Sequence, residues 1–520
     1  MNVLLITGKL AEDMVKSYAK ESSVKTKVVA LKIPVAAFLT PETIVEALKK
    51  INIKSFDMIL VPGLVRGDTA IISNAFGTPA FKGPRYAADL PTVLESLEKV
   101  KLSTVVPACD LLREILTEKA MQELEKAEQN RNELLKKPGS MLIKDWAIGK
   151  MFPMRVMAEI VDAALMEDDE IQRLAKRFVG LGANIIDVGM LAGKSSPAVA
   201  KRIVKAVKAV VDVPVSIDTL DPEEIKAAVS AGADLILSAD AGNIEKIASF
   251  ANNIPVVVIP TNQREGYFPK KAQERVQLLE ELIEKAKKLG FTKVLGDLIL
   301  EPSNVLESFI AFREFADRNP DVPLFVGVSN VTELFDADSV GLNALLARLS
   351  SEVDASIILA TEKSTKAKGT VREEVAASKM MFLAKKRGSV PKDLGVDLLV
   401  LKDKRSREEQ YNGELELKSN VIVAGEETEP VVLETEGMFK IGVDRKEETI
   451  VAMQFTTLEM DKPFNIIKGK TAESVYAKII QLGLVTRLDH AAYLGSELAK
   501  AGVALKTGKE YIQDKPLFGN

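Results

Sequence analysis

Eight short apolar segments follow one another in the central part of the chain, and amphipathic stretches of helical periodicity separate most of them. Continuous runs of Val, Ile and Leu indicate strands that are buried on both faces, as in a parallel sheet. Eight such strand and helix pairs within about 200 residues predict one closed (β/α)8 barrel. The predicted strands are residues 156–161, 184–190, 214–220, 235–240, 255–261, 293–300, 323–330 and 356–361.

Polar side chains stand at or near the carboxyl ends of five of these predicted strands. They are Asp187, Asp218, Asp240, Asp297 and Asn330. The carboxyl ends of barrel strands meet at one rim, where barrel active sites are built. A carboxylate within an apolar strand is costly unless it is paired or hydrogen-bonded, so one such residue could be a structural ion pair. Five polar residues that converge on one rim predict a polar binding pocket.

Composition excludes several classes of function. The net charge is −4 with both signs interspersed, which argues against binding to nucleic acid or to an anionic membrane. The single cysteine, Cys109, excludes disulfides within the chain and any cysteine-cluster metal site, and it suits a reducing cytoplasm. No run approaches the about 18 apolar residues that a membrane span needs. We therefore expect a cytoplasmic globular protein.

The 520 residues divide into three predicted domains. Residues 1–135 predict an α/β domain of the Rossmann or flavodoxin kind, with strands at 2–8, 25–33 and 56–63, helices at 12–20, 41–50 and 90–100, and a loop-rich stretch at 76–83. Its first turn matches no dinucleotide-binding or P-loop pattern, so its role is left open. Residues 136–390 form the barrel, preceded by a charged helix at 111–137 and a segment at 141–154 that should cross the barrel's base. Residues 391–520 predict an α+β domain, with strands at 397–404, 420–425, 430–444 and 449–456.

The barrel segments resemble those of a known superfamily. GANIIDVGM and VPVSIDTLDPEEIKAAVSAGADLI are similar to the second and third strands of the pterin-binding barrels. That superfamily contains the dihydropteroate synthases and the methyltransferases of methyltetrahydrofolate and methyltetrahydromethanopterin. The first strand, VMAEIVD, resembles the V-x-G-E-R-I-N of the methyltransferases, with Glu159 and Asp162 on the Glu and final Asn positions.

The seventh predicted strand tilts the resemblance further toward the methyltransferases. FVGVSN and the helix after it place Gly327, Ser329, Asn330 and Asn343 on matching positions. Two departures accompany them: Ser238 stands where the family has an asparagine in strand four, and ELFDAD replaces F-G-L-P. The S-R-K and R-V-H motifs of dihydropteroate synthases are absent, since this chain has SNV and LATEKS there.

The resemblance implies a set of pterin-binding residues in the barrel. Asp218 and Asp297 are expected to accept hydrogen bonds from the 2-amino edge of the pterin, because a carboxylate can accept two parallel N–H bonds. Asn330 is expected to be catalytic, with a hydrogen bond to N5 that strengthens as charge develops. A Lys-rich loop after strand eight could grip an anionic tail through Lys363, Lys366, Lys368 or Arg372, or be the solvated start of a helix. The full predicted pterin-binding set is Glu159, Asp162, Asp187, Asp218, Ser238, Asp240, Asp297 and Asn330.

The C-terminal motif carries a second resemblance. GLVTRLDHAAYLGSELAKAGVAL and YIQD are similar to the corrinoid-binding subunit of tetrahydromethanopterin S-methyltransferase, without that family's membrane helix. The resemblance implies that His490 is the lower axial ligand of cobalt and that Thr486, Ala491 and Gly495 bind the corrinoid. A lone histidine at a helix start is more often a capping or core residue. The small neighbours that would admit a flat ring keep the ligand hypothesis open.

Together these resemblances predict a corrinoid-dependent methyltransferase that moves a methyl group between a reduced pterin and cobalt. The pterin would be tetrahydromethanopterin or a close relative, and a methyl-accepting protein or thiol and a second copy of the chain are further expected partners. One alternative is a dihydropteroate synthase-like enzyme of pterin biosynthesis. The other is a non-catalytic protein that binds a pterin or a corrinoid.

Overall fold

A computed structural model of the protein describes residues 1–193, 195–402, 421–424, 438–455 and 462–518. The chain divides into two compact units. The first consists of Met1–Phe335, Val340–Thr361 and Thr370–Leu398, and it contains the N-terminal sheet and the barrel. The second consists of Asp336–Ser339, Glu362–Gly369 and Leu399–Asn520.

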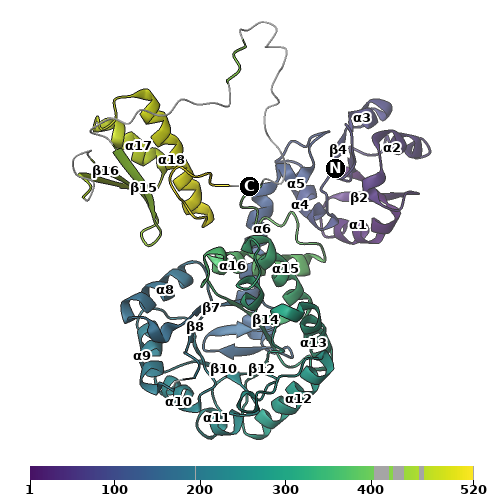
Figure 1. Ribbon diagram of the computed structural model, residues 1–520. Coiled ribbons are helices and arrows are strands. Elements are labelled where there is room, and N and C mark those ends of the chain that lie inside the picture. The colour runs from purple at the N-terminus through teal and green to yellow at the C-terminus, as the bar shows by residue number, and fades with distance from the viewer. Residues whose placement is uncertain (194, 403–420, 425–437, 456–461, 519–520) are drawn as a thin grey trace. The chain divides into compact units, whose positions relative to one another are not determined.

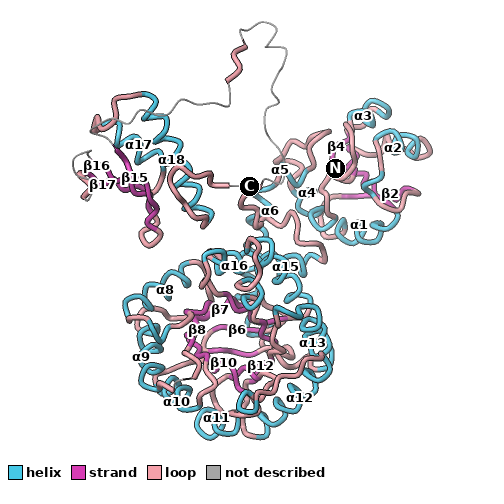
Figure 2. The backbone as a smooth tube through the Cα atoms, viewed as in Figure 1, coloured by secondary structure: helices cyan, strands magenta, loops and turns pink. Residues whose placement is uncertain are grey.

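Eight strands close into a parallel barrel in chain order, which confirms the predicted (β/α)8 fold. The helices form a ring around the strands (Figures 1 and 2). The strands are β7 (Arg155–Ile160), β8 (Ile185–Gly189), β9 (Val215–Asp218), β10 (Leu235–Ala239), β11 (Val256–Val258), β12 (Val294–Gly296), β13 (Leu324–Val326) and β14 (Ala355–Ala360). The helices are α8 (Asp168–Gly180), α9 (Pro197–Lys208), α10 (Pro222–Ser230), α11 (Ile244–Ala251), α12 (Ala272–Lys288), α13 (Val305–Arg318), α14 (Ser329–Thr332), α15 (Ser339–Glu352) and α16 (Thr370–Arg387).

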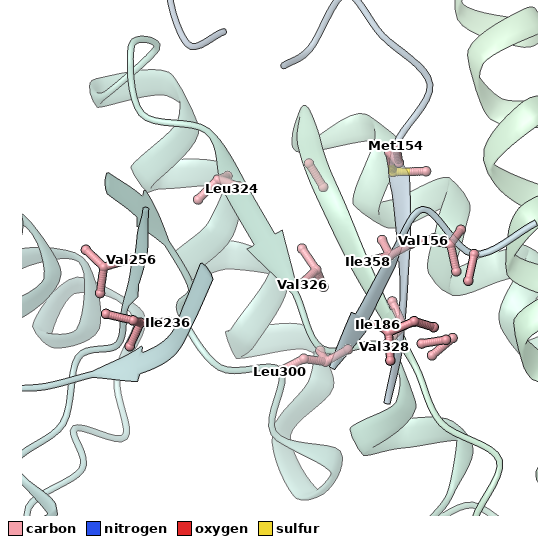
Figure 3. Packing of buried hydrophobic residues seen from close by; sticks show 14 of the residues in the cluster. Met154, Val156, Ile186, Ile236, Val256, Leu300, Leu324, Val326, Val328 and Ile358 are labelled. Atoms are coloured by element: carbon pink, nitrogen blue, oxygen red, sulfur yellow. The ribbon is translucent and has the colours of Figure 1, made fainter. Parts of the chain in front are cut away.

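Successive residues of each barrel strand point to opposite faces, and this alternation builds two apolar layers. Outward side chains such as Val156, Ile186 and Ile358 pack together in the layer under the helices (Figure 3). Inward side chains fill the interior instead, among them Met157 and Phe325. The residue two positions after each of these inward side chains also faces the barrel axis, nearer the carboxyl end. Polar residues at those positions therefore face the axis there, as Glu159 does two residues after Met157.

A short hairpin closes the other end of the barrel. It pairs β5 (Met141–Ile143) with β6 (Trp146–Ile148), and Ile143 and Ile148 join the interior apolar cluster. This confirms the prediction that residues 141–154 cross the barrel's base. Trp146 is only half-buried there, and the guanidinium of Arg155 lies over its ring at 5.0 Å from the centroid.

The N-terminal domain is a four-stranded parallel sheet with the order β2-β1-β3-β4. Two local predictions were wrong. The stretch 76–83 contains strand β4, which is too short to show a period, and the helix predicted at 90–100 ends at Glu95. Helix α3 was not predicted. The elements are β1 (Asn2–Gly8), α1 (Glu12–Ala19), β2 (Lys25–Leu31), α2 (Pro41–Leu48), β3 (Met58–Val61), α3 (Ala70–Phe76), β4 (Ala80–Lys82), α4 (Leu90–Glu95), α5 (Ala108–Leu111), α6 (Arg113–Gln129) and α7 (Arg131–Leu134).

The C-terminal unit packs two helices, α17 (Ala472–Gln481) and α18 (Leu488–Thr507), with an antiparallel sheet, as the α+β prediction requires. Its strands are β15 (Met438–Asp444), β16 (Thr449–Phe455) and β17 (Asn465–Gly469). Residues 438–444 and 449–455 confirm two predicted strands, whereas residues 397–402 and 421–424 form none. The other predicted strand residues, 403–404, 420, 425, 430–437 and 456, lie outside the described residues. Among the helices of the described ranges, none is long and apolar enough to cross a membrane.

Candidate functional site

Three acidic side chains meet inside the barrel near the carboxyl ends of its first three strands. Glu159 on β7 is in register with Asp187 on β8, which is in register with Ser216 on β9. Asp218 lies one inward position further along, opposite Gly189. One oxygen from each of Glu159, Asp187 and Asp218 lies within 4.8 Å of the other two. The parallel register of three neighbouring strands therefore brings these acids together.

Asp187 is the most enclosed member of this acid cluster, with 0% of its surface exposed. Its Oδ1 accepts a short hydrogen bond from the Ser216 hydroxyl, and its Oδ2 has no hydrogen-bond partner within the described residues. Burial, together with the charges of Asp218 and Glu159, raises the pKa of Asp187 well above its usual range. The protonated form of this carboxyl is therefore favoured relative to a carboxyl in water.

Asp218 and Asp297 are the two acids best placed to exchange a proton for a ligand near neutral pH. Burial raises the pKa of Asp218 to about 6, against a hydrogen bond that the Ser238 hydroxyl donates at 3.3 Å. Burial also raises the pKa of Asp297 to about 7, and the nearby charge of Asp218 adds to that shift. Asp297 is 8% exposed, and its Oδ1 accepts from the Ile299 backbone N–H at 2.8 Å.

A buried arginine that the sequence did not single out supports the loop after β12. Arg275 on α12 is fully buried, and its Nη1 donates to the Ile299 carbonyl at 3.1 Å. Its Nη2 lies 2.6 Å from Glu301 Oε2, in an ion pair. These bonds fix the backbone beside Asp297, where Ile299 has a φ of 62°. An arginine on the apolar face of a helical stretch was the available signal.

Gly189 is a second residue that the sequence did not single out. A Cβ at this position would lie 2.9 Å from Oε1 of Glu159 and 3.7 Å from the backbone nitrogen of Asp162. Glycine thus leaves the space into which the Glu159 carboxyl extends. Asp162 follows β7 in the left-handed conformation, with a φ of 54°, so its backbone turns the chain beside the acid cluster.

Asp240 has a different place from the other predicted pterin ligands. Its Oδ1 accepts from the Gly242 N–H at 2.8 Å. Its Oδ2 accepts from the Gln263 N–H at 2.7 Å and from the Thr261 hydroxyl at 3.1 Å. Three intrachain donors occupy this buried carboxylate, so its role is to hold the loops after β10 and β11 together.

Asn330 and Asn343, the two asparagines that follow the seventh barrel strand, lie in different surroundings. Asn330 is exposed at the start of α14, folds over Gly327 and donates to the Leu300 carbonyl at 3.2 Å. It therefore stands at the carboxyl rim, as predicted. Asn343 is fully buried on α15 and bonds to Glu373 at 2.8 Å. Asn343 therefore links helices on the outside of the barrel. The Ser329 hydroxyl oxygen accepts a hydrogen bond from the Thr361 backbone N–H at 2.6 Å.

The Lys-rich loop after β14 is engaged within the chain. Lys366 lies 3.2 Å from the Asp336 carboxylate, and Lys368 donates to the Glu362 carbonyl at 2.5 Å. These contacts favour the solvated start of a helix over an anion grip at those two lysines.

The acid cluster with Asp297 offers a ligand mainly hydrogen-bond acceptors. A flat heterocycle with several N–H groups is the organic ligand that such acceptors suit, because each buried carboxylate then gains a donor. The three clustered oxygens could also hold one divalent cation, since hard cations take oxygen ligands. Protonation is the third way to offset their charges, and the raised pKa of Asp187 favours it at that residue.

The predicted corrinoid ligand lies in an enclosed position. His490 is 0% exposed, and its ring centroid lies 6.3 Å from that of Phe439 and 6.5 Å from that of Tyr493. A lower axial ligand must present a ring nitrogen to a space that admits a macrocycle. The His490 ring has no exposed surface and so presents no nitrogen to such a space. In this position His490 does not fit a corrinoid. Thr486 is exposed, and Ala491 and Gly495 are half-buried.

The remaining polar residues of the C-terminal motif form contacts within their own unit. The Tyr511 hydroxyl donates to Glu497 at 2.8 Å, and the Tyr493 hydroxyl donates to Asp514 at 2.6 Å. Gln513 accepts from the Ile441 backbone N–H at 2.8 Å. The YIQD segment thus fastens α18 to β15, which accounts for these residues by the fold alone.

Comparisons with known proteins agree with the barrel site. Residues 159–365 match the family described as pterin binding enzyme, residues 433–514 match the family PterinBD-DUF4346, and residues 1–85 match a family of unknown function, DUF6513. The uncharacterized protein MJ0107 of Methanocaldococcus jannaschii is 42% identical over 532 residues, covering 100% of this chain and 99% of that protein. A Ycf91-like protein of Nostoc is 33% identical over 106 residues, covering 16% of this chain and 84% of that protein.

Solved structures with a similar barrel include two dihydropteroate synthases. The Yersinia pestis enzyme in a sulfonamide drug complex is 19% identical, with a TM-score of 0.40, and covers 48% of this chain and 99% of that one. The Xanthomonas albilineans enzyme in complex with 7,8-dihydropteroate is also 19% identical, with a TM-score of 0.36, and covers 44% of this chain and 91% of that one.

Proposed function

This chain belongs to the family of the uncharacterized protein MJ0107 of Methanocaldococcus jannaschii, and from that premise we propose that it is a transferase whose barrel binds a reduced pterin. The observation that carries the proposal is the convergence of Asp218, Asp297 and the acid cluster at the carboxyl end of the barrel. The match of residues 159–365 to the pterin binding enzyme family supports it.

The pterin ring supplies hydrogen-bond donors, and the site offers mainly acceptors. Its 2-amino group and adjacent ring N–H lie side by side, and an ionised carboxylate can accept both bonds at once. Asp297 and Asp218 are the acceptors that we assign to this edge, because their pKa values of about 7 and about 6 let them ionise when a donor arrives. The Ser238 hydroxyl holds Asp218 in place at 3.3 Å.

Binding of tetrahydropterin, measured by calorimetry at pH 8, tests this assignment. The variants Asp297→Asn and Asp218→Asn should each weaken binding by at least tenfold, since about 1–3 kcal/mol is lost when a buried group is left unpaired. Asp321→Asn, on an exposed loop, is the matched control and should bind as the wild type does. Unchanged affinity in both site variants would exclude this site.

The finer proposal is that the transferred group is a methyl group on pterin N5. The strand-one residues Glu159 and Asp162 and the rim position of Asn330 support it. Asn330 would turn from the Leu300 carbonyl to donate a hydrogen bond toward N5, and that bond would strengthen as the nitrogen gains electron density.

The assay supplies a Co(I) corrinoid as the nucleophile that takes the methyl group, and a proton from solvent replaces it on N5. Asn330→Ala should slow this transfer from 5-methyltetrahydropterin more than it weakens binding, because the bond strengthens in the transition state. An equal loss of rate and affinity would make Asn330 a binding residue only. A chain that instead condenses a pterin with an arylamine, without any methyl donor, would support the pterin-biosynthesis alternative.

The methyl acceptor is a separate question. A corrinoid at His490 is the hypothesis from the sequence, and the burial of His490 speaks against it in the described conformation. Hydroxocobalamin added to the protein should give a histidine-ligated cobalt spectrum that His490→Ala abolishes, if the surroundings of His490 open. An unchanged spectrum in the variant would remove the corrinoid from the proposal and leave the pterin site standing.

A further inference from the structure

The N-terminal sheet contains a recess at the point where its strand order reverses. Strand β1 has β2 on one side and β3 on the other, so the chain crosses from one side of β1 to the other between β2 and β3. In open parallel sheets, ligands bind outside the carboxyl ends of the strands at such a reversal. The recess lies there, and its open volume is about 520 Å³ with its mouth included.

The part of this space that water molecules can occupy is about 80 Å³, and a single water needs about 10–15 Å³ of such space, so the recess has room for a small ring body. Its walls come from β1 and β3, from α1, and from the segment that follows β4. They are predominantly aliphatic, with Leu5, Leu60 and Leu90 on the face of the sheet that α1 and α4 cover. The lining therefore suits a body that is apolar and about the size of one or two rings.

Two polar side chains interrupt this apolar lining. Thr7 is the next-to-last residue of β1 and is 1% exposed, and no other described residue hydrogen-bonds its hydroxyl. Arg85 also lines the recess, and its guanidinium donates to both oxygens of Asp110 at 2.7 and 2.8 Å and to Cys109 Sγ at 3.1 Å. These contacts use three of the five N–H groups of a guanidinium, so donors remain for a ligand.

The charges around the recess argue against a phosphate-bearing ligand. Asp110 already neutralises Arg85, and the first turn of α1 carries Glu12 and Asp13. Acidic residues there oppose an anion at the helix N-terminus, where nucleotide phosphates would otherwise sit. The one basic residue before this helix, Lys9, pairs with Glu12 at 2.5 Å.

We propose that this recess is a binding site for an uncharged, largely apolar compound of one or two rings that carries a single carbonyl or similar acceptor group. The ring body contacts the aliphatic walls, and the acceptor group takes hydrogen bonds from Thr7 and Arg85. The site is separate from the acid cluster of the barrel, and it gives the N-terminal domain a function of its own in small-molecule binding.

Prodan, a neutral naphthalene ketone whose emission shifts to the blue in apolar surroundings, is a suitable probe for the full-length protein. Titration should show saturable binding to one site per chain. Ala87→Phe fills the recess from its wall and should weaken binding by at least tenfold. Ala88→Phe, the neighbouring alanine that is not part of the lining, is the matched control and should leave binding unchanged.

Thr7→Val keeps the shape of the side chain and removes its hydroxyl, so binding should fall severalfold while circular dichroism stays unchanged. Excess tetrahydropterin should not displace the probe, which separates this site from the pterin site. Binding that survives both Ala87→Phe and Thr7→Val, or that is lost equally in Ala88→Phe, would overturn the proposal. So would displacement by tetrahydropterin, or loss of binding on Phe38→Ser, which would place the probe on an exposed apolar side chain.

Discussion

The barrel and the N-terminal sheet both gather the carboxyl ends of parallel strands, yet the two places have opposite chemistry. In the barrel, acids occupy the inward positions of neighbouring strands, and burial raises the pKa values of Asp187, Asp218 and Asp297. In the N-terminal sheet, Leu5 and Leu60 line the recess around one threonine and one neutralised arginine. Topology thus decides where a site forms, and the inward side chains decide what it can bind.

The two regions should also differ in their effect on stability. Buried carboxyls with raised pKa values lower the stability of the ligand-free protein when they ionise. The aliphatic walls of the recess remove apolar surface from water at about 25 cal/mol per Å², which is favourable. We therefore expect the barrel rim, and not the recess, to make stability depend on pH.

The largest expected effect comes from removing Arg275, which supports the loop after β12. Arg275→Met leaves Glu301 beside an apolar side chain and frees the loop that holds Asp297. Glu301 keeps its pair with Lys270 at 2.9 Å. The groups left without their buried donor are the Pro269 and Ile299 carbonyls and the Ser308 hydroxyl. At about 1–3 kcal/mol for each group left unpaired, the free energy of unfolding should fall by several kcal/mol, and pterin binding should weaken. Chemical denaturation and calorimetry measure the two effects.

Arg313→Met is the matched control, since Arg313 forms an exposed pair with Asp317 at 2.9 Å. Such pairs contribute about 0–1 kcal/mol, so stability should change little. Prodan binding at the recess should persist in Arg275→Met, and its loss there would show that the two regions are not independent.

The next effect concerns pH. The pKa of Asp297 is about 7 in the folded protein and about 3.9 in an unfolded chain. The folded state therefore favours the protonated acid, and stability falls as pH rises from about 4 to about 7, by roughly 1.4 kcal/mol for each pKa unit. Asp297→Asn should flatten this decline, as measured by denaturant unfolding at pH 5 and pH 8. Asp321→Asn should keep the wild-type slope, and equal slopes in both variants would contradict the burial argument.

The smallest effect probes the space beside the acid cluster. Gly189→Ala places a Cβ 2.9 Å from Glu159 Oε1, so the carboxyl must move. Such overpacking should lower stability by about 1–3 kcal/mol and weaken tetrahydropterin binding. Gly180→Ala is the control, because a Cβ there meets nothing within 4 Å. If Gly189→Ala behaves like Gly180→Ala in both measurements, the position of Glu159 is not important for the site.

Much of the architecture followed from the sequence alone. The eight apolar runs predicted eight parallel strands, and all eight are present because a strand buried on both faces must be continuously apolar. The acids at the strand ends were predicted to share one rim, and the register of β8 and β9 brings two of them, Asp187 and Asp218, near each other. The third acid within 4.8 Å is Glu159, which the family resemblance had indicated. Weakly patterned pieces such as β4, with three residues, left no comparable signal.

Only the tertiary structure decided which polar residues are available to a ligand. Asp240 and Asp297 both follow apolar strands, yet loop donors occupy the first and a single backbone N–H bonds the second. His490 stands in a motif that suggested a metal ligand, but packing against Phe439 and Tyr493 leaves its ring no exposed surface. Strand periodicity is a local property that residue types encode, whereas hydrogen-bond occupancy and exposure depend on segments far apart in the chain. The sequence therefore determined the barrel and its rim, and the three-dimensional packing decided which of the rim's groups face a ligand.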